Sequence, residues 1–256
     1  IGSGVLVFTG RAIAITGRSI CIAYLGAAVW VICMGVPTIL MCSCIRLIGG
    51  GYTQCNLFLG ERWGGFYLAI YVLSQMGLTL YAQTFALYFC ELIGGGNEKI
   101  IAALMITFFY VLNFFGVDFM SKAQNLMTAA LLLALVWFTV RGLPRVNWST
   151  FFGGEGWMTH GVKGLFATST LLTYSLLGGT SLMPYSAESK NPKRDIPLAA
   201  AISTVSIAIL FAIVGITASG ILPVDQVANQ TLGVIAKHFL TAPEYIFFMV
   251  GGALCA

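Results

Sequence analysis

Two clusters of glycine interrupt long apolar stretches of this sequence, and both predict backbone that is not continuous helix. Gly2-Ser3-Gly4 stands directly before an apolar run. The pair Gly178-Gly179 lies inside a second apolar run, and Pro184 follows a few residues later. Unpaired amides are costly in hydrocarbon, so such breaks persist only where protein, water or a ligand satisfies the freed groups. Two interrupted helices in one membrane protein therefore indicate a solute-binding site near the middle of the bilayer.

Both clusters also have a purely structural interpretation. Gly2-Ser3-Gly4 is compatible with a close contact between packed helices. Gly178-Gly179 with Pro184 is compatible with a simple kink, and nearby hydroxyls such as Ser175 can bond back to their own helix. The sequence leaves these interpretations open beside the binding site.

The composition places the chain in a membrane. Of its 256 residues, 58% are hydrophobic and only 9% are charged, and the mean hydropathy is +0.90. Soluble domains carry about 25% charged residues. Continuous apolar runs of helix length predict an all-α, polytopic helical membrane protein that contacts the lipid bilayer.

Other ligand classes receive no support from the sequence. The net charge is +4, but the basic residues form no long stripe, so no nucleic-acid partner is expected. The seven cysteines include no CxxC pair and the two histidines have no neighbour of ligand type, so we expect free thiols, no metal and no cofactor. The apolar runs hold no histidine and almost no carboxylate, which argues against an enzyme.

The elements that position the glycines are a series of apolar helices. Their expected ranges are about 5–16, 20–45, 64–93, 99–115, 123–140, 162–187 and 197–222, with an eighth helix after about 237. The first is too short to span a membrane and is interpreted as the second half of a broken helix. Asp195 is the expected N-cap of the seventh helix. Both ends of the sequence lie in apolar runs, as expected for a piece of a larger membrane protein.

Several motifs occur in a recognisable order. Gly2-Ser3-Gly4 is followed by Gly50-Gly51-Tyr52 after the second helix, then by Gly179, and then by the polar segment 188–197. Segment 113–117, Asn-Phe-Phe-Gly-Val, lies where the fourth expected helix ends. Taken together, this set resembles the amino acid–polyamine–organocation superfamily of secondary transporters, over essentially the whole chain.

The resemblance implies a particular fold. That fold is a five-plus-five inverted-repeat transporter core, of which this chain would hold a part. Residues 1–140 would form the first repeat from the second half of helix 1 to helix 5, 141–161 an interfacial loop, and 162–256 the start of the second repeat, helices 6 to 8. The glycine breaks would then occupy corresponding helices of the two repeats.

The resemblance also implies a function. It predicts a multi-pass protein of the plasma membrane that carries amino acids by alternating access as a secondary active transporter. Ser181 stands where relatives that carry agmatine or putrescine often have an acid, which favours neutral amino acids over polyamines. An exchanger of cationic substrates and a sensor that binds without transport remain as alternatives. Some proton-coupled relatives carry a lysine in helix 5, whose ammonium replaces a sodium ion. The corresponding segment 123–140 contains no lysine, and the sequence leaves open whether a proton or a sodium ion is coupled to transport.

A zwitterionic amino acid needs partners for both charges. N–H groups at the start of a half-helix suit the carboxylate, and freed carbonyl oxygens suit the ammonium. Thr79 and Gln83, in the third expected helix, are included because of the resemblance alone, and a role in helix packing is an equal interpretation of both residues. The expected substrate-binding residues are Ile1, Gly2, Ser3, Gly4, Val5, Leu177, Gly178, Gly179, Thr180, Ser181, Thr79 and Gln83. Tyr174, Tyr185 and Glu188 are candidate gating residues, with packing and helix capping as alternatives.

Overall fold

The computed structural model describes residues 4–45, 50–114, 117–152, 156–178, 189 and 191–255. Within these ranges the regular structure is helical and contains no strand. Four helical stretches there are long and apolar enough to cross a membrane: Gly4–Cys44, Glu61–Ile93, Phe119–Arg145 and Pro192–Ile221. The predicted all-α polytopic membrane class is thereby confirmed.

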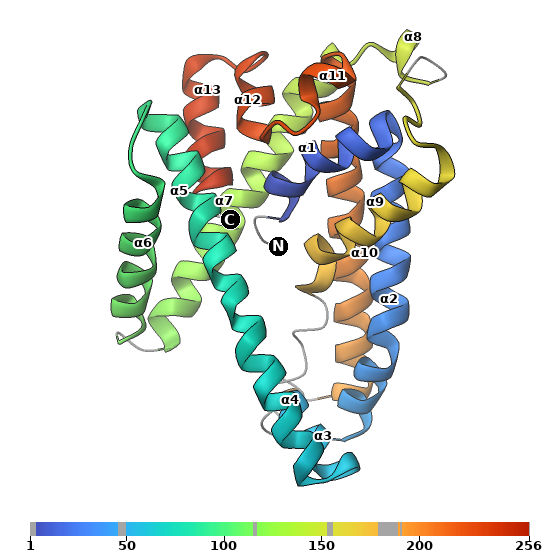
Figure 1. The fold of residues 1–256 in the computed structure, drawn as a ribbon, viewed down its shortest axis with the longest axis vertical. Helices are drawn as coiled ribbons and strands as arrows, with labels where there is room; N and C mark the ends of the chain where they lie inside the picture. The colour runs from blue at the N-terminus through green and yellow to red at the C-terminus, as the bar shows by residue number, and fades with distance from the viewer. Residues whose placement is uncertain are drawn as a thin grey trace.

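Four helices pack closely on one side of the molecule (Figure 1). They are α1 (Gly4–Thr16), α2 (Ile20–Cys44), α9 (Gly161–Leu176) and α10 (Pro192–Ile221). α2 packs against both α9 and α10, and α1 lies against α9. The rings of Tyr24 and Phe211 meet edge to face at 5.6 Å between α2 and α10, where Gly215 lets Ile20 approach closely. Small residues at such crossings permit tight helix packing in membranes.

A second group of helices extends away from these four. It comprises α3 (Gly50–Leu59), α4 (Glu61–Ser74), the 3₁₀ turn Gln75–Gly77, α5 (Leu78–Ile93) and α6 (Glu98–Asn113). Most apolar side chains of α4 are exposed, Leu73 by 64%. Such a surface suits hydrocarbon better than water. α5 ends at Ile93, where the expected helix 64–93 also ends. Gly94 adopts φ +84° there and donates its N–H to the Cys90 carbonyl oxygen at 2.9 Å.

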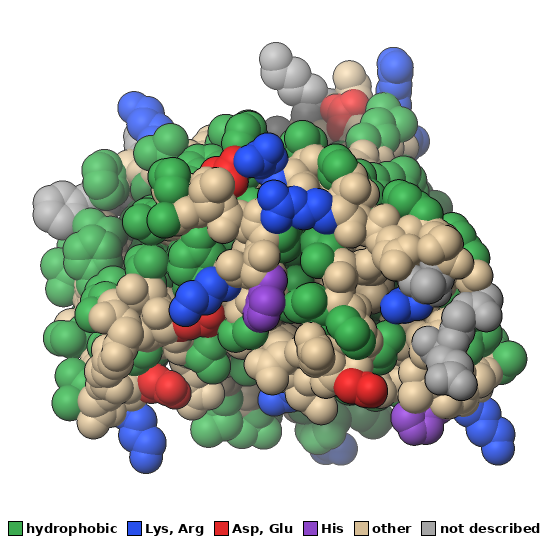
Figure 2. All heavy atoms as spheres, turned by 90° about the horizontal axis from the view of Figure 1, so that it is seen from above, with side chains coloured by type: hydrophobic (Ala, Val, Ile, Leu, Met, Phe, Trp, Pro, Cys, Tyr) green, Lys and Arg blue, Asp and Glu red, His purple; other side chains and the backbone are tan. Residues whose placement is uncertain are grey.

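The third group closes one end of the molecule. It comprises α7 (Val117–Gly142), the 3₁₀ turn Leu143–Arg145, α8 (Trp148–Phe151), α11 (Val224–Val227), α12 (Leu232–Lys237), α13 (Ala242–Phe247) and the π-helical turn Phe248–Ala253. The buried ring of Phe138 in α7 meets Phe239 edge to face and stacks on Phe248, with ring centroids 5.1 Å apart in both pairs. Seen from this end, basic, acidic and histidine side chains are spread among hydrophobic ones (Figure 2).

Two expected helix starts are wrong. α10 begins at Pro192 with Asn191 as N-cap, not near Pro197 with Asp195 as N-cap. Proline is favoured at the first helical position, and the Asp195 carboxylate instead accepts the Asn191 N–H at 3.3 Å. α7 begins at Val117 rather than near 123, so Lys122 lies in the helix and not in a loop.

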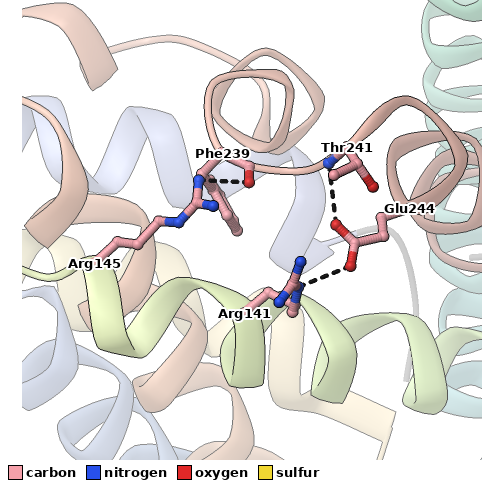
Figure 3. A network of polar contacts seen from close by, with 5 residues as sticks. All are labelled: Arg141, Arg145, Phe239, Thr241 and Glu244. Atoms are coloured by element: carbon pink, nitrogen blue, oxygen red, sulfur yellow. Dashed lines mark hydrogen bonds and ion pairs between the residues drawn. The ribbon is translucent and has the colours of Figure 1, made fainter.

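A polar network joins α7 to the start of α13 (Figure 3). Arg141 Nε lies 2.7 Å from Glu244 Oε1, and Glu244 Oε2 accepts the backbone N–H of Thr241 at 3.0 Å. Arg145 Nη1 donates to the Phe239 carbonyl oxygen at 2.6 Å. Glu244 thus both pairs with a cation and caps its own helix.

Because these two roles are separable, we expect three variants to differ in thermal stability. Arg141→Met and Glu244→Gln each remove the ion pair, whose side chains are 43% and 15% exposed, and should lower the melting temperature only slightly. Glu244→Ala also removes the acceptor for Thr241, so it should cost roughly 1 kcal/mol more. Thermal unfolding in one detergent checks the order. Equal stability of Glu244→Ala and Glu244→Gln would contradict the capping role.

Candidate functional site

The first residues of α1 lie beside the last residues of α9, about half-way along the molecule (Figure 1). The helices are antiparallel. At one end a ring nitrogen of His160 lies 2.8 Å from the Ile15 carbonyl oxygen. At the other end a Cβ placed on Gly4 would lie 2.6 Å from Ser175 Oγ and 2.9 Å from Ser175 Cα. The Gly4 and Gly178 regions, distant in sequence, are therefore brought together.

α9 ends where the glycine pair begins. Its α-helical part stops at Leu176, and Leu177 and Gly178 follow as a 3₁₀ turn. A Cβ on Gly178 would meet nothing within 4 Å in the described structure. The last carbonyl oxygens of a helix have no intrahelical partner, so this end offers acceptors.

The start of α1 offers the complementary donors. α1 begins at Gly4, and Gly4, Val5 and Leu6 are buried. The first N–H groups of a helix lack intrahelical acceptors and carry the positive end of its dipole. Tyr88 of α5 holds this segment by donating its hydroxyl to the Leu6 carbonyl oxygen at 3.0 Å. The donor end of one helix thus lies beside the acceptor end of another.

Two hydroxyls on α9 add unused polar capacity. Thr168 Oγ1 and Ser175 Oγ are buried and have no hydrogen-bond partner within the described part of the chain. The two residues are seven apart, so they share one face of α9. Buried polar atoms are normally hydrogen-bonded, which makes each a candidate contact for a bound solute.

Tyr174, an expected gating residue, connects three helices. Its ring meets Phe8 of α1 edge to face at 5.7 Å, and its hydroxyl lies 3.4 Å from that of Tyr81 on α5. A Cβ added to Gly77 would lie 3.7 Å from the Tyr174 hydroxyl oxygen. Tyr174 remains 40% exposed, so it stands at the edge of the meeting point rather than in the core.

Thr79 and Gln83 line a separate cavity of about 690 Å³. Its walls come from α1, α5, α6 and the connector 229–231 between α11 and α12. The Thr79 hydroxyl donates to the Met76 carbonyl oxygen at 2.6 Å, so its proton is used within its own helix. Gln83 is exposed and makes no hydrogen bond to any other described residue. Its amide is therefore available to a ligand.

Sequence reasoning missed other residues of this cavity. Arg11 of α1 lines it beside Val7, and Glu98 and Lys99 line it from α6. A single charge inside the apolar α1 was a usable signal for Arg11. The connector had no such signal, because its place depends on contacts between distant segments.

The connector 229–231 binds both α1 and α5. Asn229 donates its N–H to the Gly10 carbonyl oxygen at 2.9 Å. Thr231 donates its hydroxyl to Glu91 of α5 at 3.3 Å, and Glu91 also accepts from the Tyr245 hydroxyl at 3.1 Å.

The remaining expected site residues lie outside the described residues. They are Ile1, Gly2, Ser3, Gly179, Thr180, Ser181, Tyr185 and Glu188.

The fold defines an integral helical membrane protein. Residues 1–256 match the sequence profile of a family described as amino acid permease. The chain therefore belongs to the amino acid permease family, which agrees with the superfamily resemblance noted in its motifs.

Three relatives illustrate the similarity. The amino-acid permease GAP3 of Candida albicans is 28% identical over 78% of this chain and 35% of its own length. The vacuolar cationic amino acid transporter 4 of Arabidopsis thaliana is 28% identical over 48% of this chain and 21% of its own. The serine/threonine exchanger SteT of Bacillus subtilis is 25% identical over 99% of this chain and 58% of its own. The chain thus spans less than two thirds of each relative.

Proposed function

We propose that this chain is the substrate-binding part of a secondary active transporter that carries amino acids by alternating access. The observation that supports this most directly is the meeting of Gly4 at the start of α1 with Ser175 near the end of α9. A donor end and an acceptor end side by side match the two charged groups of an amino acid. The proposal includes no enzymatic step and no cofactor.

The binding chemistry uses main-chain atoms. The N–H groups of Ser3, Gly4 and Val5 would donate to the substrate carboxylate, favoured by the dipole of α1. The carbonyl oxygens near Leu177 and Gly178-Gly179 would accept from the ammonium. No charged side chain is needed at either end, which avoids the cost of leaving a buried charge unpaired when the site is empty.

The side chains around this meeting point complete the proposed site. The hydroxyls of Thr180 and Ser181 would add contacts at the acceptor end, while Ile1 and Gly2 would precede the donor end. Tyr174 and Tyr185 would act as gates, and Glu188 would lie at the outer edge. Thr79 and Gln83 would contact the substrate side chain from the cavity.

We propose neutral amino acids as the favoured substrates. Polyamines and cationic amino acids need a nearby carboxylate, and position 181 holds a serine. In the described cavity the basic Arg11 and Lys99 outnumber the acidic Glu98. Exchange of cationic substrates is the second candidate, because one relative is named a cationic amino acid transporter.

Alternating access would move one group of helices against the rest. The packing of α1 and α2 with α9 and α10 supports treating these four as one moving body. The inverted repeat formed by 1–140 and 162–256, joined through 141–161, belongs to the same proposal. We place the protein in the plasma membrane, where a permease would take up amino acids.

Uptake by the full-length protein in proteoliposomes tests this function. We expect saturable uptake and counterflow of at least one neutral amino acid, and a thermal shift with the same compound. Imposed proton and sodium gradients distinguish the coupling modes. Absence of uptake and counterflow for every amino acid contradicts transport. A thermal shift without any flux favours a sensor instead.

A further inference from the structure

The cavity beside α1 contains an arginine with no partner in the described structure. Arg11 is the single charged residue of α1 and lines the cavity of about 690 Å³. The ion pair found among described residues joins Arg141 to Glu244, and no described hydrogen bond involves Arg11. Arg11 is exposed in the described structure, and an unpaired charge inside an apolar helix is a candidate functional group in a membrane protein.

The position of Arg11 relates it to the proposed binding site. It follows Gly4 by seven residues, which corresponds to about 10 Å along the helix axis. Side chains of a helix lean toward its N-terminus, so Arg11 leans back over Val7 toward the end that begins at Gly4. The cavity lining includes Val7 and Arg11 but not Gly4, so a substrate whose α-carboxylate binds at Gly4 would reach Arg11 by extending its side chain into this cavity.

The opposite wall of the cavity supplies a second polar group. Gln83 of α5 lines the same space and makes no hydrogen bond within the described chain. Tyr88, one turn further along α5, is occupied by the Leu6 carbonyl oxygen and is not available. A guanidinium and an amide thus line one cavity, and neither has a partner among the described residues.

We propose that Arg11 determines side-chain specificity, by binding substrates whose side chain ends in a carboxylate or a carboxamide. The proposal rests on the proposed function: among neutral amino acids it selects those with a carboxamide, and it adds the acidic amino acids to the substrate class. The planar guanidinium donates two parallel N–H groups to a carboxylate and can donate to the oxygen of a carboxamide. Its positive charge disfavours lysine and arginine as substrates. Lys99 adds to this effect, and Glu98 opposes it from α6.

Competition experiments on the full-length protein in proteoliposomes test Arg11. Unlabelled glutamine, glutamate, leucine and lysine compete against uptake of labelled glutamine. We expect glutamine and glutamate to compete best and lysine worst in the wild-type protein. Arg11→Gln should weaken competition by glutamate about tenfold to a hundredfold, because a charge-assisted hydrogen bond is lost. It should leave competition by leucine near its wild-type value.

Two further variants control this experiment. Arg62→Gln makes the same charge change at an exposed position of α4 and should leave the order of competitors unchanged. Arg11→Lys keeps the charge without the planar fork, so it should retain glutamate better than glutamine. If Arg11→Gln does not fold, Arg11→Lys decides the question: an unchanged ratio of glutamate to glutamine competition in this variant overturns the assignment.

The two proposals fail in different ways. A wild-type protein that transports leucine or lysine but neither glutamine nor glutamate contradicts the role of Arg11 alone. An unchanged order of competitors in folded Arg11→Gln does the same. A wild-type protein that transports no amino acid contradicts the proposed function itself.

Discussion

Gly4→Leu should abolish amino acid uptake, lowering it by roughly a hundredfold or more, because the substrate carboxylate loses its main-chain donors. Even the first carbon of the new side chain would lie 2.9 Å from the Cα of Ser175, and backbone cannot move aside as a flexible side chain can. The leucine would fill the space between the ends of α1 and α9. Uptake in proteoliposomes and the substrate-dependent thermal shift both measure this loss.

A matched glycine at the other helix end controls for general damage. Gly178→Ala introduces a Cβ that meets no described residue within 4 Å, so this variant should fold with wild-type thermal stability. Gly4→Leu must also be recovered in folded, membrane-inserted form. If folded Gly4→Leu still binds and transports the substrate, the assignment of the carboxylate to the start of α1 is wrong.

Gly10→Val should cause the largest loss of stability, about 3 kcal/mol, through overpacking against backbone. A Cβ at Gly10 would lie 1.9 Å from the carbonyl oxygen of Gln230 and 2.9 Å from its carbonyl carbon. The connector would have to leave α1, which breaks the bond from the Asn229 N–H to the Gly10 carbonyl oxygen. The apparent melting temperature in detergent should fall by several degrees.

A glycine in open space provides the comparison for Gly10. Gly65 lies within α4, and a Cβ there would meet nothing within 4 Å in the part of the chain that the structure describes. Gly65→Ala should therefore be neutral, or stabilising by up to about 1 kcal/mol, since alanine is the better helix former. Equal melting temperatures for Gly10→Val and the wild type would show that the connector does not bear on α1 as described.

The helices were largely predictable because apolar length and glycine placement determine them locally. α1, α2 and the end of α5 at Gly94 follow the sequence pattern within a residue or two. The expected start of α10 near Pro197 is wrong because Pro197 lies inside the helix, five residues after Pro192, which occupies the first helical position. Local capping chemistry around Asn191 and Pro192 decided the true start.

The site was less predictable because its walls join residues that are far apart in the chain. Gly4 and Gly178 were found from their composition, since glycine inside an apolar run is itself unusual. That Ser175 would lie against Gly4 needed the packing of α1 on α9. The contact of Asn229 with Gly10 joins segments more than two hundred residues apart and has no sequence pattern.

The hydrogen bonds that hold α1 affect the interpretation of mutational surveys of this protein. Tyr88 and Asn229 attach to the carbonyl oxygens of Leu6 and Gly10, four residues apart, and not to their side chains. Every amino acid carries that oxygen, so exchanging Leu6 for another apolar residue leaves its anchorage intact. Replacing Leu6 by apolar residues of similar volume would therefore not reveal this bond, and substitutions at its donor, Tyr88 in α5, would.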